Sequence, residues 1–220
     1  MIVIIERIAG FLFLFIIITN LMASIFGYKT IGDVGSEAQL QKINKDPTKF
    51  KVGVMLILIE HFSIISLAII LFIAFGSYNP ILGIVWCISR IGEGLIQIYD
   101  KKSYWSLLNL ATKYSSNNVK EKEEFIDLGR SILKIKASRF LFAQILFSIG
   151  TFAYSLLFII YGVLPPIIGW FGIIASIIYG FGNGLFHLKS NFRILWNIGG
   201  LLVLFFELVL GGWLLIFSHM

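Results

Sequence analysis

Charged residues are scarce in this chain. Aspartate, glutamate, lysine and arginine make up 14% of the 220 residues, whereas 58% are hydrophobic. A soluble domain typically has about 25% charged and about 45–50% apolar residues. Because a soluble fold of this length could not cover so much apolar surface, the composition excludes a soluble globular protein. It indicates one polytopic membrane domain over residues 1–220.

Cysteine and the common catalytic signatures are also lacking. The one cysteine, Cys87, excludes an intrachain disulfide and says nothing about the redox compartment. Gly32 and Gly35 lack the Gly-Lys-Ser/Thr ending of a P-loop, and neither G-x-S-x-G nor H-E-x-x-H occurs. We therefore expect no cofactor and no metal. A metal site built from His61, His187 and a glutamate is the alternative.

Six apolar runs are long enough to cross a bilayer, which takes about 20 residues in a helix. The first is longer than the apolar core of a typical signal peptide. The pattern predicts an all-α polytopic integral membrane protein with six transmembrane helices in a bundle. The spans are expected at roughly 8–26, 52–75, 80–99, 140–161, 167–186 and 194–217.

The connections between these runs differ in length. Tight turns are predicted at Ser77–Pro80 and Val163–Pro166, and a polar loop over residues 28–50. Residues 101–114 suit either an interfacial helix or a continuation of the third span. The amphipathic segment 119–139 is expected to lead into the fourth span on the cytoplasmic side, with Asn118 as N-cap and Glu121 completing a capping box. Its alternative roles are to lie on the membrane surface or to dock a partner.

Basic residues gather in the loops after the first, third and fifth runs, and the two tight turns carry none. The positive-inside rule then predicts a cell-membrane protein with these loops in the cytoplasm and both termini outside. The same distribution accounts for the net charge of +6 without a nucleic-acid partner.

Four ionisable residues lie inside the apolar runs: Glu60, Arg90, Glu93 and Glu207. A charge at such depth is expensive unless it is paired or solvated, so it usually marks a functional interior. If the second and third runs fold about Tyr78, Glu60 and Glu93 lie within about 5 Å of the same depth. Arg90 shares a helix face with Glu93 and is expected to reach Glu207.

The charges of these four residues do not balance. Three carboxylates and one guanidinium sum to a formal −2. In a low-dielectric interior at least one glutamate should carry a proton, or a cation should fill the site. One interpretation is a polar cavity for a ligand, proton or cation. The alternative is interhelical contacts that only hold the bundle together.

Further polar residues in or near the runs could line such a cavity: Asn20, His61, Tyr154, Asn183 and Asn197. We include Tyr154 and Asn197 with the four charged residues as candidate ligand-binding residues. His61 is about 100° from Glu60 around a helix and is expected on another face. The spacing of Gly180 and Gly184 predicts close helix packing, with a locally loosened helix as the alternative.

Short motifs give the chain a family resemblance. They are RIAGFLF at 7–13, RIGE at 90–93, LPPIIG at 164–169 and the acid Glu207. In this order they resemble the prokaryotic multi-pass family called domain of unknown function 4386. The likeness covers nearly the whole chain and is weakest over 115–136.

The resemblance implies a small multi-helix membrane protein and passes on no catalytic residues. It also implies that Arg90, Glu93 and Glu207 stand where the family carries the same residue types. Our leading hypothesis is a protein that binds or transports a lipid or another amphipathic small molecule with a cationic or hydrogen-bonding head. We expect Glu93→Gln to abolish binding. The alternatives are a lipid-modifying enzyme with a carboxylate pair or a metal, and a regulatory or structural subunit.

Overall fold

The computed structural model describes residues 2–26, 36–116, 119–188 and 192–217, without the side chains of residues 115, 116, 119–121 and 187. All regular elements in these ranges are helices. They are α1 (Ile2–Ile25), α2 (Ser36–Lys45), α3 (Pro47–Phe75), α4 (Pro80–Ser116), α5 (Val119–Tyr161), α6 (Pro166–Leu188) and α7 (Arg193–Ile216). In this part of the chain, six helices are long and apolar enough to cross a membrane, which confirms the predicted fold class.

The third and fourth spans are longer than their apolar runs. α4 continues without a break through residues 101–114, so this stretch is a continuation of the third span. α5 joins the amphipathic segment 119–139 to the fourth span in one helix, as predicted. The proposed cap at Asn118 and Glu121 lies outside the described residues and side chains.

The prediction of a polar loop over 28–50 is wrong for its second half. Residues 36–45 form α2, and α3 already begins at Pro47. Leu40 and Ile43, one turn apart on α2, are almost fully buried in an apolar cluster with residues of α3 and α4. Two apolar residues are too weak a periodic signal to predict a helix. Tertiary packing stabilises this one.

Local chemistry explains where several spans begin and end. The Asp46 side chain accepts a hydrogen bond from the backbone N–H of Lys49 at 2.9 Å, and Pro47 occupies the first turn of α3. Asn79 Oδ1 accepts a hydrogen bond from the N–H of Leu82 at 3.1 Å, at the start of α4. Gly162, with φ of 61°, takes the left-handed conformation that ends α5.

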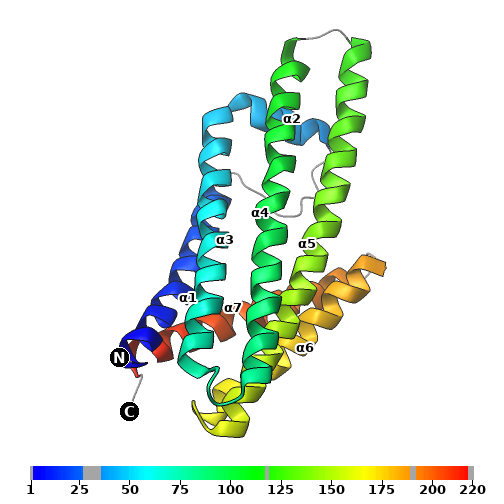
Figure 1. The fold of residues 1–220 in the computed structure, drawn as a ribbon. Coiled ribbons are helices and arrows are strands. Elements are labelled where there is room, and N and C mark those ends of the chain that lie inside the picture. The colour runs from blue at the N-terminus through cyan, green and yellow to red at the C-terminus, as the bar shows by residue number, and fades with distance from the viewer. Residues whose placement is uncertain (1, 27–35, 117–118, 189–191, 218–220) are drawn as a thin grey trace.

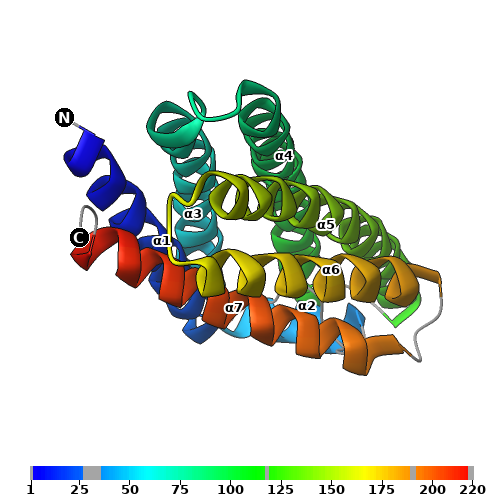
Figure 2. The same cartoon turned by 90° about the horizontal axis from the view of Figure 1, so that it is seen from below.

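The six long helices form a closed ring. Each packs against its neighbour along the chain, and α1 packs against α7 to close the circle. Figure 1 shows both termini at the same end as the two tight turns, while α4 and α5 project beyond the other helices at the opposite end. There α2 packs across α3, α4 and α5. Figure 2 shows the ring from below, with α6 and α7 crossing in front of α5 and α1.

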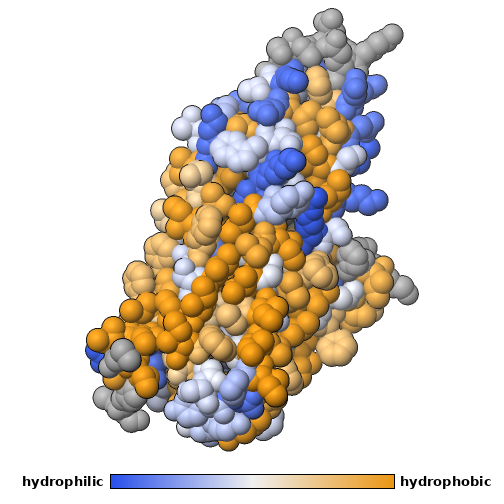
Figure 3. All heavy atoms as spheres, viewed as in Figure 1, coloured by the Kyte–Doolittle hydropathy of each residue, from blue (hydrophilic) through white to orange (hydrophobic). Residues whose placement is uncertain are grey.

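The surface matches this arrangement. In Figure 3 apolar residues cover the lower part of the visible face, and hydrophilic residues gather on the projecting ends of α4 and α5 and around α2. One buried apolar cluster has members on all six long helices and packs inside the ring, and a second lies under α2. An apolar girdle with a polar cap is what a membrane-spanning bundle requires.

Glycines allow close approach at particular crossings. A Cβ on Gly10 would stand 2.7 Å from the carbonyl oxygen of Gly211, so the backbones of α1 and α7 meet there. Gly180 packs against Ser148 of α5, whereas the space beside Gly184 is open. α6 is continuous past both, so the alternative of a loosened helix is wrong.

Candidate functional site

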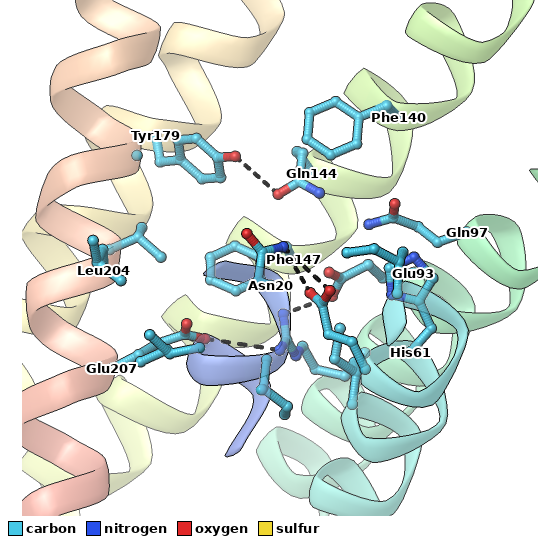
Figure 4. A pocket seen from close by; sticks show the side chains of 18 of the residues that line it. Asn20, His61, Glu93, Gln97, Phe140, Gln144, Phe147, Tyr179, Leu204 and Glu207 are labelled. Atoms are coloured by element: carbon cyan, nitrogen blue, oxygen red, sulfur yellow. Dashed lines mark hydrogen bonds and ion pairs between the residues drawn. The ribbon is translucent and has the colours of Figure 1, made fainter. Parts of the chain in front are cut away.

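A cavity of about 320 Å³ lies inside the ring and is lined by all six long helices. Ordinary water occupies about 30 Å³ per molecule, so the space would hold roughly ten waters or a small head group. Figure 4 shows polar side chains pointing into it from opposite walls. The polar residues of the lining are Asn20, Glu60, His61, Arg90, Glu93, Gln97, Gln144, Tyr179 and Glu207.

Arg90 connects two of the glutamates. Its Nη1 lies 2.6 Å from Oε2 of Glu93, one turn away on α4, and its Nη2 lies 3.8 Å from Oε1 of Glu207 on α7. Arg90 is 1% exposed. The predicted reach from Arg90 to Glu207 is therefore confirmed. The first pair is a short charge-assisted hydrogen bond, whereas the second is a longer electrostatic contact.

Aromatic rings complete the surroundings of the guanidinium. Its central carbon lies 4.4 Å from the ring centroid of Phe147 and 5.4 Å from that of Trp86, within cation–π range. Trp86 is fixed by its Nε1, which donates to the carbonyl of Ala68 at 3.2 Å. The guanidinium of Arg90 is thus held between the rings of Phe147 and Trp86, which restrict its orientation.

Tyr154 belongs to the support of this cluster. Its ring meets Trp86 edge-on with centroids 4.2 Å apart and stacks beside Phe206. Tyr154 is buried and does not line the cavity. Asn197, the other polar candidate, is exposed on α7 and is not part of the lining.

Glu60 is held from α1. The Nδ2 of Asn20 donates to both oxygens of Glu60, at 3.1 and 3.2 Å. A neutral amide satisfies the carboxylate oxygens without cancelling their charge. The structure thus brings together the four charged candidates and Asn20, which come from four different helices.

His61 lines the same cavity as Glu60, so the expectation that it lies on another face is wrong. The wall formed by α3 consists of Ile57, Glu60, His61 and Ile64, the positions of a broad helical face. Such a face is about 100° wide, which admits two adjacent residues at its edges. His61 is 3% exposed, and neither ring nitrogen has a hydrogen-bond partner among the described residues.

Three uncharged polar residues of the lining were not predicted: Gln97, Gln144 and Tyr179. Gln97 lies one turn beyond Glu93 on the cavity face of α4, a spacing that could have revealed it. Gln144 of α5 accepts a hydrogen bond from the Tyr179 hydroxyl of α6 at 2.9 Å. Asn183, which the sequence offered as a possible lining residue, is fully buried but does not line the cavity, and its Nδ2 donates to the carbonyl of Tyr179.

Two buried lysines were also missed. Lys101 and Lys136 are each 4% exposed, and their ammonium groups lie 4.9 and 4.4 Å from the ring centroid of Tyr104. Lys101 and Lys136 are not part of the cavity lining. Both lysines sit in mixed sequence, where hydropathy does not indicate burial.

Two exposed residues of the lining indicate where the cavity opens. The exposed lining residues are Asn20 and Leu21, in the C-terminal half of α1, and they face the half-buried Gly200 and Leu204 of α7. The two helices touch at Gly10 and Gly211, well away from these residues. The mouth therefore lies between two helices of the apolar girdle.

Metal binding receives no geometric support from the described part of the chain, where no three His, Cys, Asp or Glu residues could hold an ion. The side chain of His187, part of the proposed metal alternative, lies outside the described residues.

The model of one protein family, described as a domain of unknown function (DUF4386), matches residues 8–217 of the chain. No curated protein and no solved structure matches the chain. Because the match covers almost the entire sequence, the chain belongs to the DUF4386 family, as its motifs suggested.

Proposed function

We propose that this member of the DUF4386 family binds or transports an amphipathic small molecule or lipid, whose cationic head enters the cavity. The observation that carries the proposal is the charge of the site. Three carboxylates and one guanidinium line a cavity of about 320 Å³ inside the ring of membrane-spanning helices. An excess of negative charge in a low-dielectric site favours a cation over a neutral or anionic ligand.

Glu207 is the carboxylate best placed to receive the head. Its contact with Arg90 is long, at 3.8 Å, and its side chain is 13% exposed, whereas Glu93 is 3% exposed and held at 2.6 Å. Glu60 faces the same space, with the amide of Asn20 on its oxygens. His61 adds a donor and an acceptor that a polar head can use.

The mouth suits an apolar tail. On these two helices the apolar lining consists of the exposed Leu21, the half-buried Leu204 and the buried Ile17 and Val203. A ligand with its head at Glu207 would extend its tail between these helices into the bilayer. Since lipid tails and these side chains are equally apolar, the tail can occupy this position without leaving a hydrocarbon environment.

The substitution Glu207→Gln tests the proposal. With dodecyltrimethylammonium as the probe, we expect binding to weaken about tenfold or more, because a close pair of opposite charges at a binding interface contributes about 1.5 kcal/mol or more. The measurement is titration calorimetry in a neutral detergent. Glu93→Gln is a less direct test than the sequence suggested, because Glu93 also holds Arg90.

The matched control is Glu124→Gln, the same exchange at an exposed position of α5. It should leave binding unchanged, and dodecanol, which has the same chain and no charge, should bind all three proteins alike. If Glu207→Gln binds the ammonium probe as tightly as the wild type, the cavity does not receive a cation. If neither protein binds the probe and the variant only melts earlier, the cluster serves to hold helices together.

The same proposal places the protein in the cell membrane with its basic loops in the cytoplasm. Arg193 and the lysines of α2 all follow odd-numbered spans, at the ends opposite the two tight turns. The positive-inside rule favours this orientation, with both termini outside.

A further inference from the structure

A second feature lies on the outer face of the ring, along α4 and α5. A groove of about 600 Å³ runs between these helices and is lined at one end by Tyr99, Ser138 and Arg139. Its other end reaches Ile145, which also lines an adjoining apolar groove of about 670 Å³ beside α6. The two grooves adjoin at Ile145, with polar residues at one end and mainly apolar residues along the rest, and we refer to them together as the channel.

The polar end lies at the depth of lipid head groups. Arg139 is 22 residues from Tyr161 at the far end of α5, which corresponds to about 33 Å of helix. Tyr99 is 19 residues from the start of α4 at Pro80, or about 29 Å. The hydrocarbon core is about 30 Å thick, so both residues stand at its boundary.

The charge at this end is positive. Arg139 is 36% exposed on its side chain, and its Nη1 contacts Oδ1 of Asp100 at 3.4 Å. Asp100 is buried and also accepts a hydrogen bond from Ser103 at 3.2 Å, so it holds the guanidinium from the protein side. The ring of Tyr99 lies 5.0 Å from the guanidinium carbon, and Lys102, three residues further along α4, is exposed.

The apolar part has the length of one leaflet. From Arg139 the channel passes Phe142, Ile145 and Ile149 to Phe152, a rise of about 20 Å along α5. One leaflet contributes about half of the hydrocarbon core, or about 15 Å. An acyl chain that starts at the head-group level would therefore be covered along its whole length.

We propose that this channel holds one anionic phospholipid, with its phosphate on Arg139 and an acyl chain in the groove between α4 and α5. A guanidinium offers several donors in a plane that matches phosphate oxygens, and Ser138 adds a hydroxyl beside it. Basic sites at the membrane boundary favour anionic over zwitterionic head groups. The site is separate from the central cavity and does not depend on its ligand.

The experiment compares two lipids with the same acyl chains, phosphatidylglycerol and phosphatidylcholine, in native mass spectrometry of the full-length protein. The wild type should retain phosphatidylglycerol preferentially. Arg139→Gln should reduce this retention about fivefold to tenfold, as expected from the loss of one basic group at the membrane surface. Arg139→Lys should keep most of the preference.

The matched control is Arg130→Gln. Arg130 is on the same helix and pairs with Asp127 at 2.9 Å, but it is 71% exposed and lies beyond the groove. A second variant, Ile149→Trp, fills the groove without changing a charge and should also reduce lipid retention. Equal retention of both lipids by the wild type would overturn the proposal. So would an Arg139→Gln protein that keeps the preference, or a control that loses as much as Arg139→Gln.

Discussion

At the scale of single residues, Arg90 organises the interior. It is buried at 1% exposure and contacts Glu93, Glu207, Trp86 and Phe147, which belong to three helices. A buried charge is tolerated only when partners surround it. We therefore expect that replacing Arg90 would disturb Glu93 and Glu207 more than it would disturb helix α4.

The pair Arg90 and Glu93 gives a prediction at this scale. Arg90→Gln should lower the free energy of unfolding by about 3–5 kcal/mol, because Glu93 is left as an uncompensated buried charge. The double variant Arg90→Gln/Glu93→Gln should recover part of this loss, because two neutral amides replace the ion pair. Thermal unfolding in detergent measures both. Losses that simply add would show that the two residues do not stabilise each other.

At the scale of elements, the crossing of α1 and α7 closes the ring. The helices touch where Gly10 faces Gly211 and the backbone of Leu215. Beyond this contact lie the residues of the cavity mouth, Asn20 and Leu21 on one side and Gly200 and Leu204 on the other. The contact therefore sets how far apart the two walls of the mouth stand.

Gly10→Ala tests this contact. The new Cβ would stand 2.5 Å from the backbone nitrogen of Leu215, so the helices must separate. We expect a loss of about 1–3 kcal/mol of stability, typical of overpacking, and weaker binding of dodecyltrimethylammonium. Gly212→Ala is the control, because the space beside that residue is open. Equal melting temperatures for Gly10→Ala and the wild type would mean that the crossing can relax freely.

At the scale of the whole molecule, the ring follows from chain order. Every long helix packs on its neighbour in sequence, and two tight turns join α3 to α4 and α5 to α6. Short connections force neighbours to run antiparallel. Figure 1 accordingly shows the tight turns and both termini at one end and α2 at the other.

Orientation in the membrane is tested by cysteine labelling in intact cells. In a Cys87→Ser background, Ser77→Cys in the first tight turn should react with a membrane-impermeant maleimide added outside. Ser131→Cys, on the exposed face of the α5 extension, should react only after the membrane is opened. The reverse pattern would mean that the basic loops are outside, against the positive-inside rule.

The sequence by itself determined the six spans, the two tight turns and the four ionisable residues within the apolar runs. These depend on hydropathy over about 20 residues, on proline and glycine chemistry, and on the expense of a charge in hydrocarbon. Arg90 and Glu207 lie at similar distances from the outer ends of their spans, and this was enough to predict that they meet across the ring, because a helix has a constant rise.

Only the tertiary structure decided which residues face the cavity. Helix α2 is stabilised because Leu40 and Ile43 pack on an apolar surface, and the buried Lys101 and Lys136 both contact the ring of Tyr104. His61 enters the lining and Asn197 stays outside. Such outcomes depend on the rotation of each helix about its axis. Packing against neighbours far along the chain sets that rotation, and no local pattern encodes it.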